Sequence, residues 1–429
     1  MKISYLLAFT TVLIFIAFIS FNKSYRRYYL LFVLYFIPFM DLSISLPNWG
    51  SLKVFDFISY ISFFVLFKDF ISYKEKHVIY HFLFFALILV LLLGSLISNF
   101  ISNSLLSILS IPPIFIYAKS MINECYEDSE FQRKVIQCLK FAVLLSIIFL
   151  VVQIIVGLKF TFYVELNRNT LNIHGIRYTS FFHDPQKYQQ FLALLSFVFL
   201  INYKNIRQPN FKNYILFLVI IVAMLMTGGR SAMIGLLAGL ILLFFSLGQR
   251  HRIIMLVSLV TTGIIAVNFS DSLLIFQRSE NFNNDIDFRN ILWQEAYNIY
   301  KDHTLFGIGL GNYGNYSFHV SQVWYITAEK DVVFLGAESG YMTILSETGT
   351  LGIIISFLFI VIPIFSSLKG FLKGNKNVII FIFMASILSW LVSFVSLYSL
   401  NDKRILIPVI TFICLIIATK FTNPKFNDL

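Results

Sequence analysis

The stretch "VIYHFLFFALILVLLLGSLIS", residues 78–98, contains no Asp, Glu, Lys or Arg. An α-helix rises about 1.5 Å per residue, so this stretch is long enough to cross the roughly 30 Å of hydrocarbon in a bilayer. Runs of similar character recur from residue 3 to residue 420. Because lipid offers the backbone no hydrogen-bond partners, these runs are expected to be helical. The sequence therefore predicts an all-α, polytopic membrane protein.

The composition supports this class and argues against others. The chain has 429 residues, of which 58% are hydrophobic and only 13% are charged, too few to cover the surface of a soluble protein of this length. The formal net charge is +11, but the basic residues lie in short segments between apolar runs, so no nucleic-acid partner is expected. The first run lacks a small-residue cleavage site and is expected to be a retained helix. The three cysteines form no disulfide or metal-binding pattern.

Hydropathy predicts about 12–13 transmembrane helices in one polytopic domain, residues 1–429, without an internal repeat or a linker. The predicted spans are 3–21, 28–47, 54–67, 78–98, 103–121, 139–157, 189–203, 212–227, 231–247, 252–269, 340–365, 377–395 and 404–420.

Basic residues in the connections predict the orientation. They gather near 23–27, 68–76, 119–134, 204–212, 250–252 and 369–376. The positive-inside rule places these connections in the cytoplasm, so segments 158–188, 227–231 and 270–339 face outward from an inner-membrane type of protein. Residues 270–339 are then one large external loop. Within it, "DFRNILWQEAYNIYKDH" predicts an amphipathic helix on the membrane surface, with Ile291, Leu292, Ala296, Ile299 and Tyr300 on its apolar face.

The external loop contains a G-x-G-x-x-G spacing at Gly309, Gly311 and Gly314. In dinucleotide-binding proteins these glycines follow a strand in a βαβ unit. Here they follow a predicted helix, on the side of the membrane without nucleotide pools. We therefore expect the glycines to supply positive φ angles or backbone that passes close to a ligand.

Three arginines stand out on the predicted outer face, which the orientation rule would otherwise deplete of basic charge. Arg177 lies in "HGIRYTSFFHDPQKYQQF", Arg230 in "TGGRSAMIGLLAGL" and Arg289 in "DFRNILWQ". A guanidinium binds phosphate oxygens in a bidentate manner, so each arginine is a candidate substrate-binding residue. The alternative for each is an arginine that anchors a helix end at the membrane interface.

Acids and a histidine complete the candidate set. Glu338 lies at the mouth of a span and is the candidate general base; alternatively, it is an acid favoured by a helix N-terminus. Glu347, farther into the same span, is expected to lock helices together. His183 precedes Asp184-Pro185 and contacts substrate or simply lies in a helix cap. The acids of "SENFNNDIDF" (Glu280, Asp285, Asp287) fit no calcium loop and are expected to form a solvated loop.

Four stretches in this order resemble the O-antigen ligase and O-antigen or exopolysaccharide polymerase superfamily of bacterial membrane glycosyltransferases. They are "RYTSFFHDPQKYQQF" (177–191), "TGGRSAMIGLLAGL" (227–240), "RNILWQEAYNIYKDHTLFGIGLGNYG" (289–314) and "AESGYMTILSETGTLGII" (337–354). The resemblance covers roughly residues 170–360. It implies a GT-C-like helical fold, a polyprenyl-pyrophosphate-linked glycan donor, no metal and no other cofactor.

One departure from the family pattern separates two activities. The ligase branch has a His, usually followed by Asn, just before the last motif, whereas this chain has Glu338-Ser339. The resemblance to the polymerase branch therefore implies transfer of a glycan from undecaprenyl pyrophosphate to a sugar hydroxyl of a second lipid-linked repeat unit, with inversion. Glu338 would be the base, and Arg177, Arg230, Arg289 and His183 would bind substrate.

Two alternatives remain open. One is ligase-type transfer of a finished glycan to a terminal acceptor, and the other is a lipid-linked glycan flippase or transporter. A transporter would be expected to carry charges deep within several spans, often in two related halves. In every case the expected partners are lipid-linked oligosaccharides and the lipid bilayer, and a chain-length regulator and a flippase are further partners. The aromatic residues of the external loop (Trp293, Tyr297, Tyr313, Tyr316, Trp324) would stack on sugars or anchor the loop at the interface.

Overall fold

The structure is a computed structural model. It describes residues 3–20, 25–46, 50–67, 78–163, 166, 171–172, 175–201, 211–246, 282–322, 325–326, 332–333, 336–372 and 378–421, together with a few isolated positions between 252 and 263.

Helices dominate the described residues, and the strands form only three two-stranded antiparallel hairpins. The helices are α1 (Ile3–Ser20), α2 (Tyr25–Tyr35), η1 (Ile37–Phe39), α3 (Val54–Val65), α5 (Val78–Ile97), α6 (Ile101–Ile108), α7 (Ile111–Glu127), α8 (Ser129–Val156), α9 (Pro185–Ser196), η4 (Phe197–Leu200), α10 (Phe211–Met226), α11 (Ser231–Ser246), α14 (Phe282–Asp302), α15 (Tyr313–His319), α16 (Gly340–Leu372), α17 (Val378–Ser393) and α18 (Lys403–Phe421). The hairpins are β1 (Ser43–Leu46) with β2 (Gly50–Lys53), β3 (Leu171–Asn172) with β4 (Gly175–Ile176), and β5 (Tyr325–Ile326) with β6 (Val332–Val333).

This architecture confirms the predicted all-α, polytopic membrane protein. Within the described ranges, four segments are long and apolar enough to cross a membrane, namely α5, α6 with α7, α8 and α16, and five shorter apolar helices accompany them. Many large apolar side chains point outward from these helices, such as Phe82 and Leu96 on α5 and Ile155 on α8. A soluble protein rarely exposes contiguous apolar surface of this kind, whereas lipid tails cover it without cost.

Helices α9, α17 and α18 lie at the centre of the bundle, since most of their described side chains are buried. Helix α11 packs closely along α17. A Cβ atom added to Gly235 would lie 2.2 Å from the Ser389 carbonyl oxygen, and one on Gly239 would lie 2.8 Å from that of Ala385. Small residues four apart let helix backbones approach in this way within membranes. Because the contacts run in opposite directions along the two helices, α11 and α17 are antiparallel.

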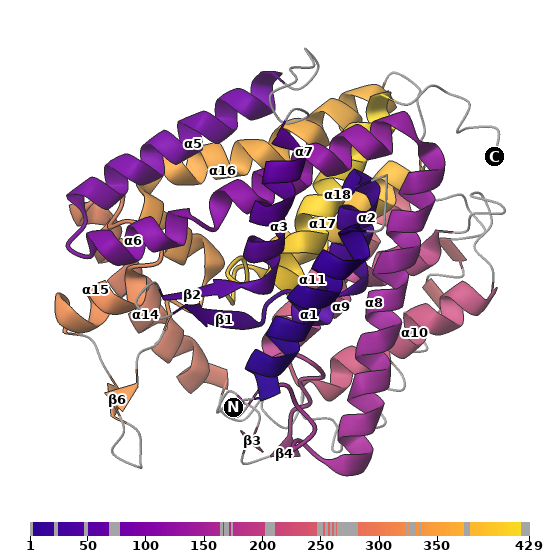
Figure 1. Cartoon of the computed structure of the whole chain (residues 1–429). Coiled ribbons are helices and arrows are strands. Elements are labelled where there is room, and N and C mark those ends of the chain that lie inside the picture. The colour runs from indigo at the N-terminus through magenta and orange to yellow at the C-terminus, as the bar shows by residue number, and fades with distance from the viewer. Residues whose placement is uncertain are drawn as a thin grey trace.

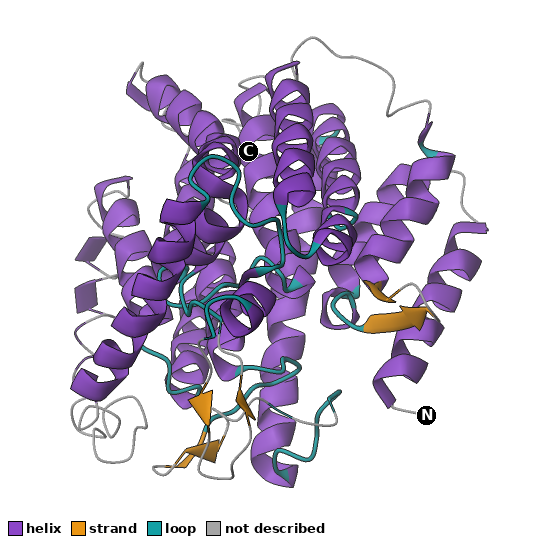
Figure 2. Ribbon diagram, turned by 90° about the vertical axis from the view of Figure 1, so that its left-hand side faces the viewer, coloured by secondary structure: helices purple, strands orange, loops and turns teal. Residues whose placement is uncertain are grey.

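The segments that were predicted to face outward meet at one end of the bundle, which we call the site end. It holds the β1–β2 hairpin and the loops near 177–184, 227–230, 336–340 and 394–402, which are joined by hydrogen bonds described below. The opposite end holds the turn between α7 and α8, where Arg26 and Arg27 pair with Glu124. In Figure 1 the β3–β4 hairpin and β6 lie in the lower part of the picture, and the α7–α8 turn lies at the top. Figure 2 shows the strands in the lower half of the molecule.

Several predicted spans differ in the structure. The one at 103–121 is divided between α6 and α7 by a turn at residues 109–110. The span predicted at 28–47 is wrong, because α2 ends at Tyr35 and is followed by a 3-10 turn that contains Pro38 and then by strand β1. Proline fixes φ and lacks the N–H that a continuing helix needs. The span predicted at 252–269 lies largely outside the described residues.

The predicted amphipathic helix of the external loop is present as α14. Leu292, Ala296 and Ile299 are buried as expected, but Ile291 is 55% exposed and does not belong to the buried face. The helix packs against α16 rather than lying alone. Asp285 and Asp287 fall within the first turns of α14, not in the predicted solvated loop, and Glu280 lies outside the described residues.

Candidate functional site

The candidate site is organised around the end of α17. The antiparallel packing of α11 on α17 places the first residue of α11, Ser231, level with the last turn of α17. At the same point the Gly340 N–H, which opens α16, donates to the Phe394 carbonyl at 2.8 Å. The Phe394 ring packs so closely on Gly340 that an added Cβ atom would lie 2.2 Å from it. Arg230 and Glu338, which precede these two helices, therefore lie at the same end of the bundle.

Two polar side chains donate hydrogen bonds to backbone carbonyls of the turn that carries Arg230. Arg177 Nε donates to the Thr227 carbonyl at 2.8 Å, and Gln189 Nε2 donates to the carbonyl of Gly229. Gly228 takes a φ of 66°, which lets the chain turn sharply between α10 and α11. Arg177 is only 1% exposed. It supports the turn, while Arg230 lies at its tip with a half-buried side chain whose Nη2 atom is buried.

Glu338 and Arg289 form an ion pair. Arg289 Nε donates to Glu338 Oε2 at 3.2 Å, and the two side chains are 29% and 25% exposed. Arg289 extends from α14, within the external loop, and Glu338 lies just before α16. The structure thus brings together two residues that are 49 positions apart in the sequence and were singled out separately.

The backbone at Glu338 adopts an unusual conformation. Its φ is 44°, in the left-handed region that residues other than glycine rarely occupy. The helix cap of α16 is supplied by the next residue: Ser339 Oγ accepts from the Met342 N–H at 3.4 Å. The Glu338 carboxylate binds Arg289 and does not cap the helix, although its position just before α16 also fits the alternative of an acid favoured by a helix N-terminus. Strained backbone of this kind, at a cost of about 1–3 kcal/mol, is a recurrent feature of functional sites.

His183 lies apart from this pair. It is exposed, and its ring meets that of Tyr163 edge-on at 5.4 Å. Burial lowers the pKa of His183, so the ring is mainly neutral at pH 7. The neighbouring Asp184 is the N-cap of α9, where its carboxylate accepts from the Gln186 N–H at 2.7 Å and Pro185 occupies the first turn. His183 is therefore next to a helix cap, as one of its two interpretations expects.

The glycine-rich loop has a structural role. Gly309 and Gly311 have φ angles of 90° and 78°, as predicted, whereas Gly314 lies within α15 and has no positive φ. Gly307, just before them, has a φ of 68°. The close approach that was predicted toward a ligand is made instead to the protein itself. A Cβ atom on Gly309 would lie 2.7 Å from Ser104 Oγ of α6, and one on Gly307 would lie 2.4 Å from the backbone of Glu347.

This loop fills a break in α16. Gly349 has a φ of 65° and interrupts the helix, which leaves backbone groups on both sides without helical partners. The Gly309 N–H donates to the Glu347 carbonyl at 2.9 Å, and the Thr350 N–H donates to the Thr304 carbonyl at 2.8 Å. The Glu347 carboxylate accepts from the Tyr313 N–H at 3.1 Å. Glu347 is thus a locking residue, as the sequence indicated.

The aromatic residues of the external loop divide into two kinds. Tyr313 is buried and packs with Ala296 and Ile299, so it belongs to the core of the loop. Tyr297 is 40% exposed and lies 4.8 Å from the Lys301 ammonium, where a sugar face could reach its ring. Tyr316 shares a hydrogen bond of 3.1 Å with His303 Nε2. Trp324 lies outside the described residues.

Sequence reasoning missed a buried ion cluster at the site end. Arg404, at the start of α18, binds Asp402 through two nitrogens, with Nε–Oδ1 at 2.9 Å and Nη2–Oδ2 at 2.6 Å. Its Nη1 donates to the Phe181 carbonyl at 2.5 Å, and its guanidinium stacks 4.3 Å from the ring centre of Phe182. Burial raises the pKa of Asp402, but the Arg404 charge outweighs it and holds that pKa below its usual value.

The cluster extends to the first part of the chain. The Lys403 ammonium lies 2.8 Å from Asp56 Oδ1 in α3, and both side chains are only 4% exposed. Asp41 accepts from Lys53 Nζ at 2.5 Å and from the Lys403 N–H at 2.8 Å. Lys187 of α9 donates to the Asn401 side chain at 3.1 Å. The sequence contains two signs of this ion cluster: Asp41 interrupts an apolar run, and "NDKR" (401–404) stands directly before a predicted span.

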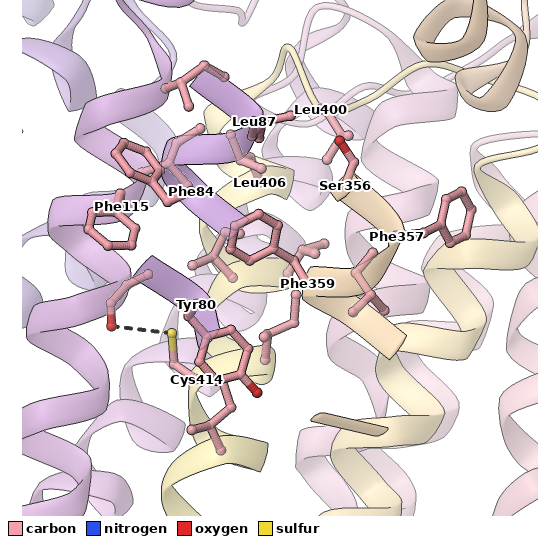
Figure 3. A pocket seen from close by; sticks show the side chains of 18 of the residues that line it. Tyr80, Phe84, Leu87, Phe115, Ser356, Phe357, Phe359, Leu400, Leu406 and Cys414 are labelled. Carbon is pink, nitrogen blue, oxygen red and sulfur yellow. Dashed lines mark hydrogen bonds between the residues drawn. The ribbon is translucent and has the colours of Figure 1, made fainter. Parts of the chain in front are cut away.

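An apolar pocket leads away from the site end between α5, α7, α16, α17 and α18. At the site end the pocket is bounded by Tyr341 and Phe394, next to Gly340. From there it continues past Phe84 and Phe115 to Tyr80 and Cys414. Figure 3 shows Tyr80, Phe84 and Phe115 beside the space between the helices, with the Cys414 thiol donating to a backbone carbonyl. The empty volume is about 1300 Å³, part of which is open to the surroundings.

Comparison with known proteins agrees with the resemblance. Residues 215–357 match the family model described as O-Antigen ligase. The match includes Arg230, Arg289 and Glu338, and leaves Arg177 and His183 outside it. No curated protein matches the chain. The match confirms the resemblance to the O-antigen ligase and polymerase superfamily in this part of the chain.

Proposed function

We propose that this chain, an integral membrane protein of the O-antigen ligase and polymerase superfamily, polymerises lipid-linked oligosaccharide repeat units. The growing glycan leaves undecaprenyl pyrophosphate and is joined to a sugar hydroxyl of a second lipid-linked unit, for O-antigen, capsule or exopolysaccharide synthesis. The observation that carries the proposal is the Arg289–Glu338 pair beside the outer limit of an apolar pocket. It joins an acid, a cation and the outer end of an apolar pocket at one end of the bundle.

The proposed reaction needs positive groups that stabilise the departing diphosphate and one base that accepts a proton. The C–O bond between the anomeric carbon and the diphosphate breaks with its electron pair, and the diphosphate carries the charge away. Arg230 and Arg289 stabilise that charge, and guanidinium groups suit this because they bind phosphate oxygens in a bidentate manner. Glu338 accepts the proton of the attacking hydroxyl. Attack opposite the leaving group inverts the anomeric carbon. No step uses a metal ion, and metal independence stays a prediction.

Arg177 and His183 have different places in this proposal. Arg177 fixes the Thr227–Arg230 turn through the Thr227 carbonyl and so positions Arg230. His183 is mainly neutral at pH 7, and its ring lies against Tyr163, whose ring centre is 5.4 Å from the Arg404 guanidinium of the ion cluster. It would contact the sugars of a bound substrate from that side.

The apolar pocket suits the isoprenoid chain of the donor. It begins three residues after Glu338, at Tyr341, and extends along helices of which α5, α7 and α16 belong to segments long enough to span a bilayer. Because lipid tails are as apolar as the pocket, moving the chain from the bilayer into it gains little hydrophobic free energy. The diphosphate end would therefore supply the affinity, and the pocket would supply orientation.

The ligase reading fits the family match equally well. Glu338 in place of the ligase histidine favours the polymerase. The flippase alternative is disfavoured, since the candidate site residues gather at one end of the bundle. We further propose that the site end faces outward from the bacterial cytoplasmic membrane, and that a chain-length regulator and a flippase act with this protein.

The lipid-linked glycans of cells that lack the protein would test the proposal. A polymerase predicts single repeat units on lipid, facing outward, with no longer chains. Full-length chains stranded on lipid would instead identify a ligase. Units held on the cytoplasmic leaflet would identify a flippase, and either of these results would reject the proposed reaction.

Arg230→Lys is expected to reduce polymer yield strongly and Arg230→Ala to abolish it almost completely, with normal protein abundance. Lysine keeps the charge but loses the planar fork that binds two phosphate oxygens together. The measurement is the glycan chain-length distribution in membranes matched for protein level. An arginine that only anchors α11 at the interface would tolerate lysine, so full-length polymer from Arg230→Ala would reject the phosphate role.

A further inference from the structure

Arg289 and Glu338 bind each other across the site. Their side chains are separated by 3.2 Å and are each about one-quarter exposed, so the pair is reachable by a ligand. In the proposed reaction each group has a different role: Arg289 binds phosphate oxygens, and Glu338 accepts a proton. While Arg289 Nε donates to Glu338 Oε2, that oxygen is occupied and is not open to an acceptor hydroxyl.

We propose that the Arg289–Glu338 ion pair is a latch that the diphosphate of the lipid-linked donor opens. The inference rests on the proposed function and adds an order of events to it. Donor phosphate oxygens compete with the carboxylate for Arg289, and the freed carboxylate then becomes available to the acceptor hydroxyl. The donor binds first, and the Glu338 carboxylate becomes available as a base only when a leaving group is in place.

The balance of the step is simple. Binding exchanges one charge-assisted hydrogen bond, from Arg289 to carboxylate, for another, from Arg289 to phosphate. The proton of the acceptor hydroxyl then moves to Glu338, the new glycosidic C–O bond forms, and the bond to the diphosphate breaks with its electron pair. Glu338 afterwards returns the proton to water, and Arg289 pairs with it again when the lipid diphosphate departs.

The backbone around the latch favours a defined rather than a loose arrangement. Ala337 and Ser339, on either side of Glu338, are buried, and the Gly340 N–H is bound to the Phe394 carbonyl. Glu338 therefore stays in its left-handed conformation while its side chain changes partner. Arg289 extends from α14, which packs on α16, so both sides of the latch are held by the same pair of helices.

The test is a binding measurement that needs no turnover. Purified protein in lipid nanodiscs is titrated with radiolabelled geranylgeranyl pyrophosphate, an isoprenyl diphosphate without a glycan. Glu338→Gln should bind this probe about two- to fivefold more tightly than the unaltered protein, which is the scale of losing a competing, partly exposed ion pair. Arg289→Ala should bind it more weakly, and the gain from Glu338→Gln should vanish in the Arg289→Ala background.

The matched control is Asp302→Asn, an exposed acid at the end of α14 that changes the net charge by the same amount. Equal tightening by Asp302→Asn would mean a general charge effect and would overturn the latch. Unchanged affinity in Glu338→Gln, or a gain that persists in the Arg289→Ala background, would overturn it as well. If the latch pattern holds but cells without the protein still make polymer, the proposed function fails and the latch stands.

Discussion

Glu338→Gln is expected to lower the rate of glycan transfer by about 10²- to 10⁴-fold, the usual scale for loss of a general base. Glutamine keeps the shape of the side chain and can still accept a hydrogen bond from Arg289, but it cannot accept a proton. Single lipid-linked repeat units should accumulate while protein abundance stays constant. The measurement is the rate of chain growth with purified protein, together with the lipid-linked glycans of cells that carry the variant.

Asp302→Asn serves again as the control and should leave chain growth nearly normal. If Glu338 mattered only as an acid near the start of α16, the substitution would cost less than about 1 kcal/mol of stability and would change polymer little. The structure already assigns the cap of α16 to Ser339. Near-normal chains from Glu338→Gln would transfer the base role to another group, with His183 the next candidate.

Arg404→Met is expected to destabilise the protein by about 3–5 kcal/mol, the scale for removing one partner of a buried ion pair. The substitution leaves the Asp402 carboxylate buried without its bidentate partner and removes the bond to the Phe181 carbonyl. The measurement is thermal unfolding of purified protein in detergent, supported by membrane abundance. The residue does not touch the proposed substrate, so activity per folded molecule should fall much less than abundance.

Two variants control this prediction. Lys134→Met removes a cation whose pair with Glu130 is largely exposed, and its unfolding temperature should hardly change. Asp402→Asn combined with Arg404→Met removes both charges and should recover part of the lost stability. An Arg404→Met protein that unfolds at the temperature of the unaltered chain would show that the cluster does not hold the site end together.

Much of the fold could be predicted because a bilayer imposes simple rules. The apolar runs became helices, and the segments that the charge pattern placed on one side, near Arg177, Arg230 and Glu338, do meet at one end. Helix α14 followed from its periodicity, with the exception of Ile291. These features depend on neighbours in the sequence, and a local pattern is enough to find them.

Other features depend on partners that are far apart in the chain. The Lys403 N–H donates to Asp41, which lies 362 positions earlier, and a hydropathy profile cannot reveal such a contact. The early end of α2 depends on Pro38, which a window average over an apolar run conceals. Arg177 looked like an exposed cation, but the Thr227 carbonyl and its burial assign it to supporting the turn. The helix break at Gly349 is tolerated because residues 304–309 hydrogen-bond to the backbone groups that the break leaves open.

The most direct test of the central claim is chain growth by the purified protein. The protein, reconstituted in vesicles, is supplied with a single kind of lipid-linked repeat unit and no other acceptor. The account predicts a ladder of products that differ by one repeat, with one isoprenyl pyrophosphate released for each bond formed. Absence of any ladder from this substrate, with transfer of preassembled chains to a separate acceptor when one is added, would contradict it.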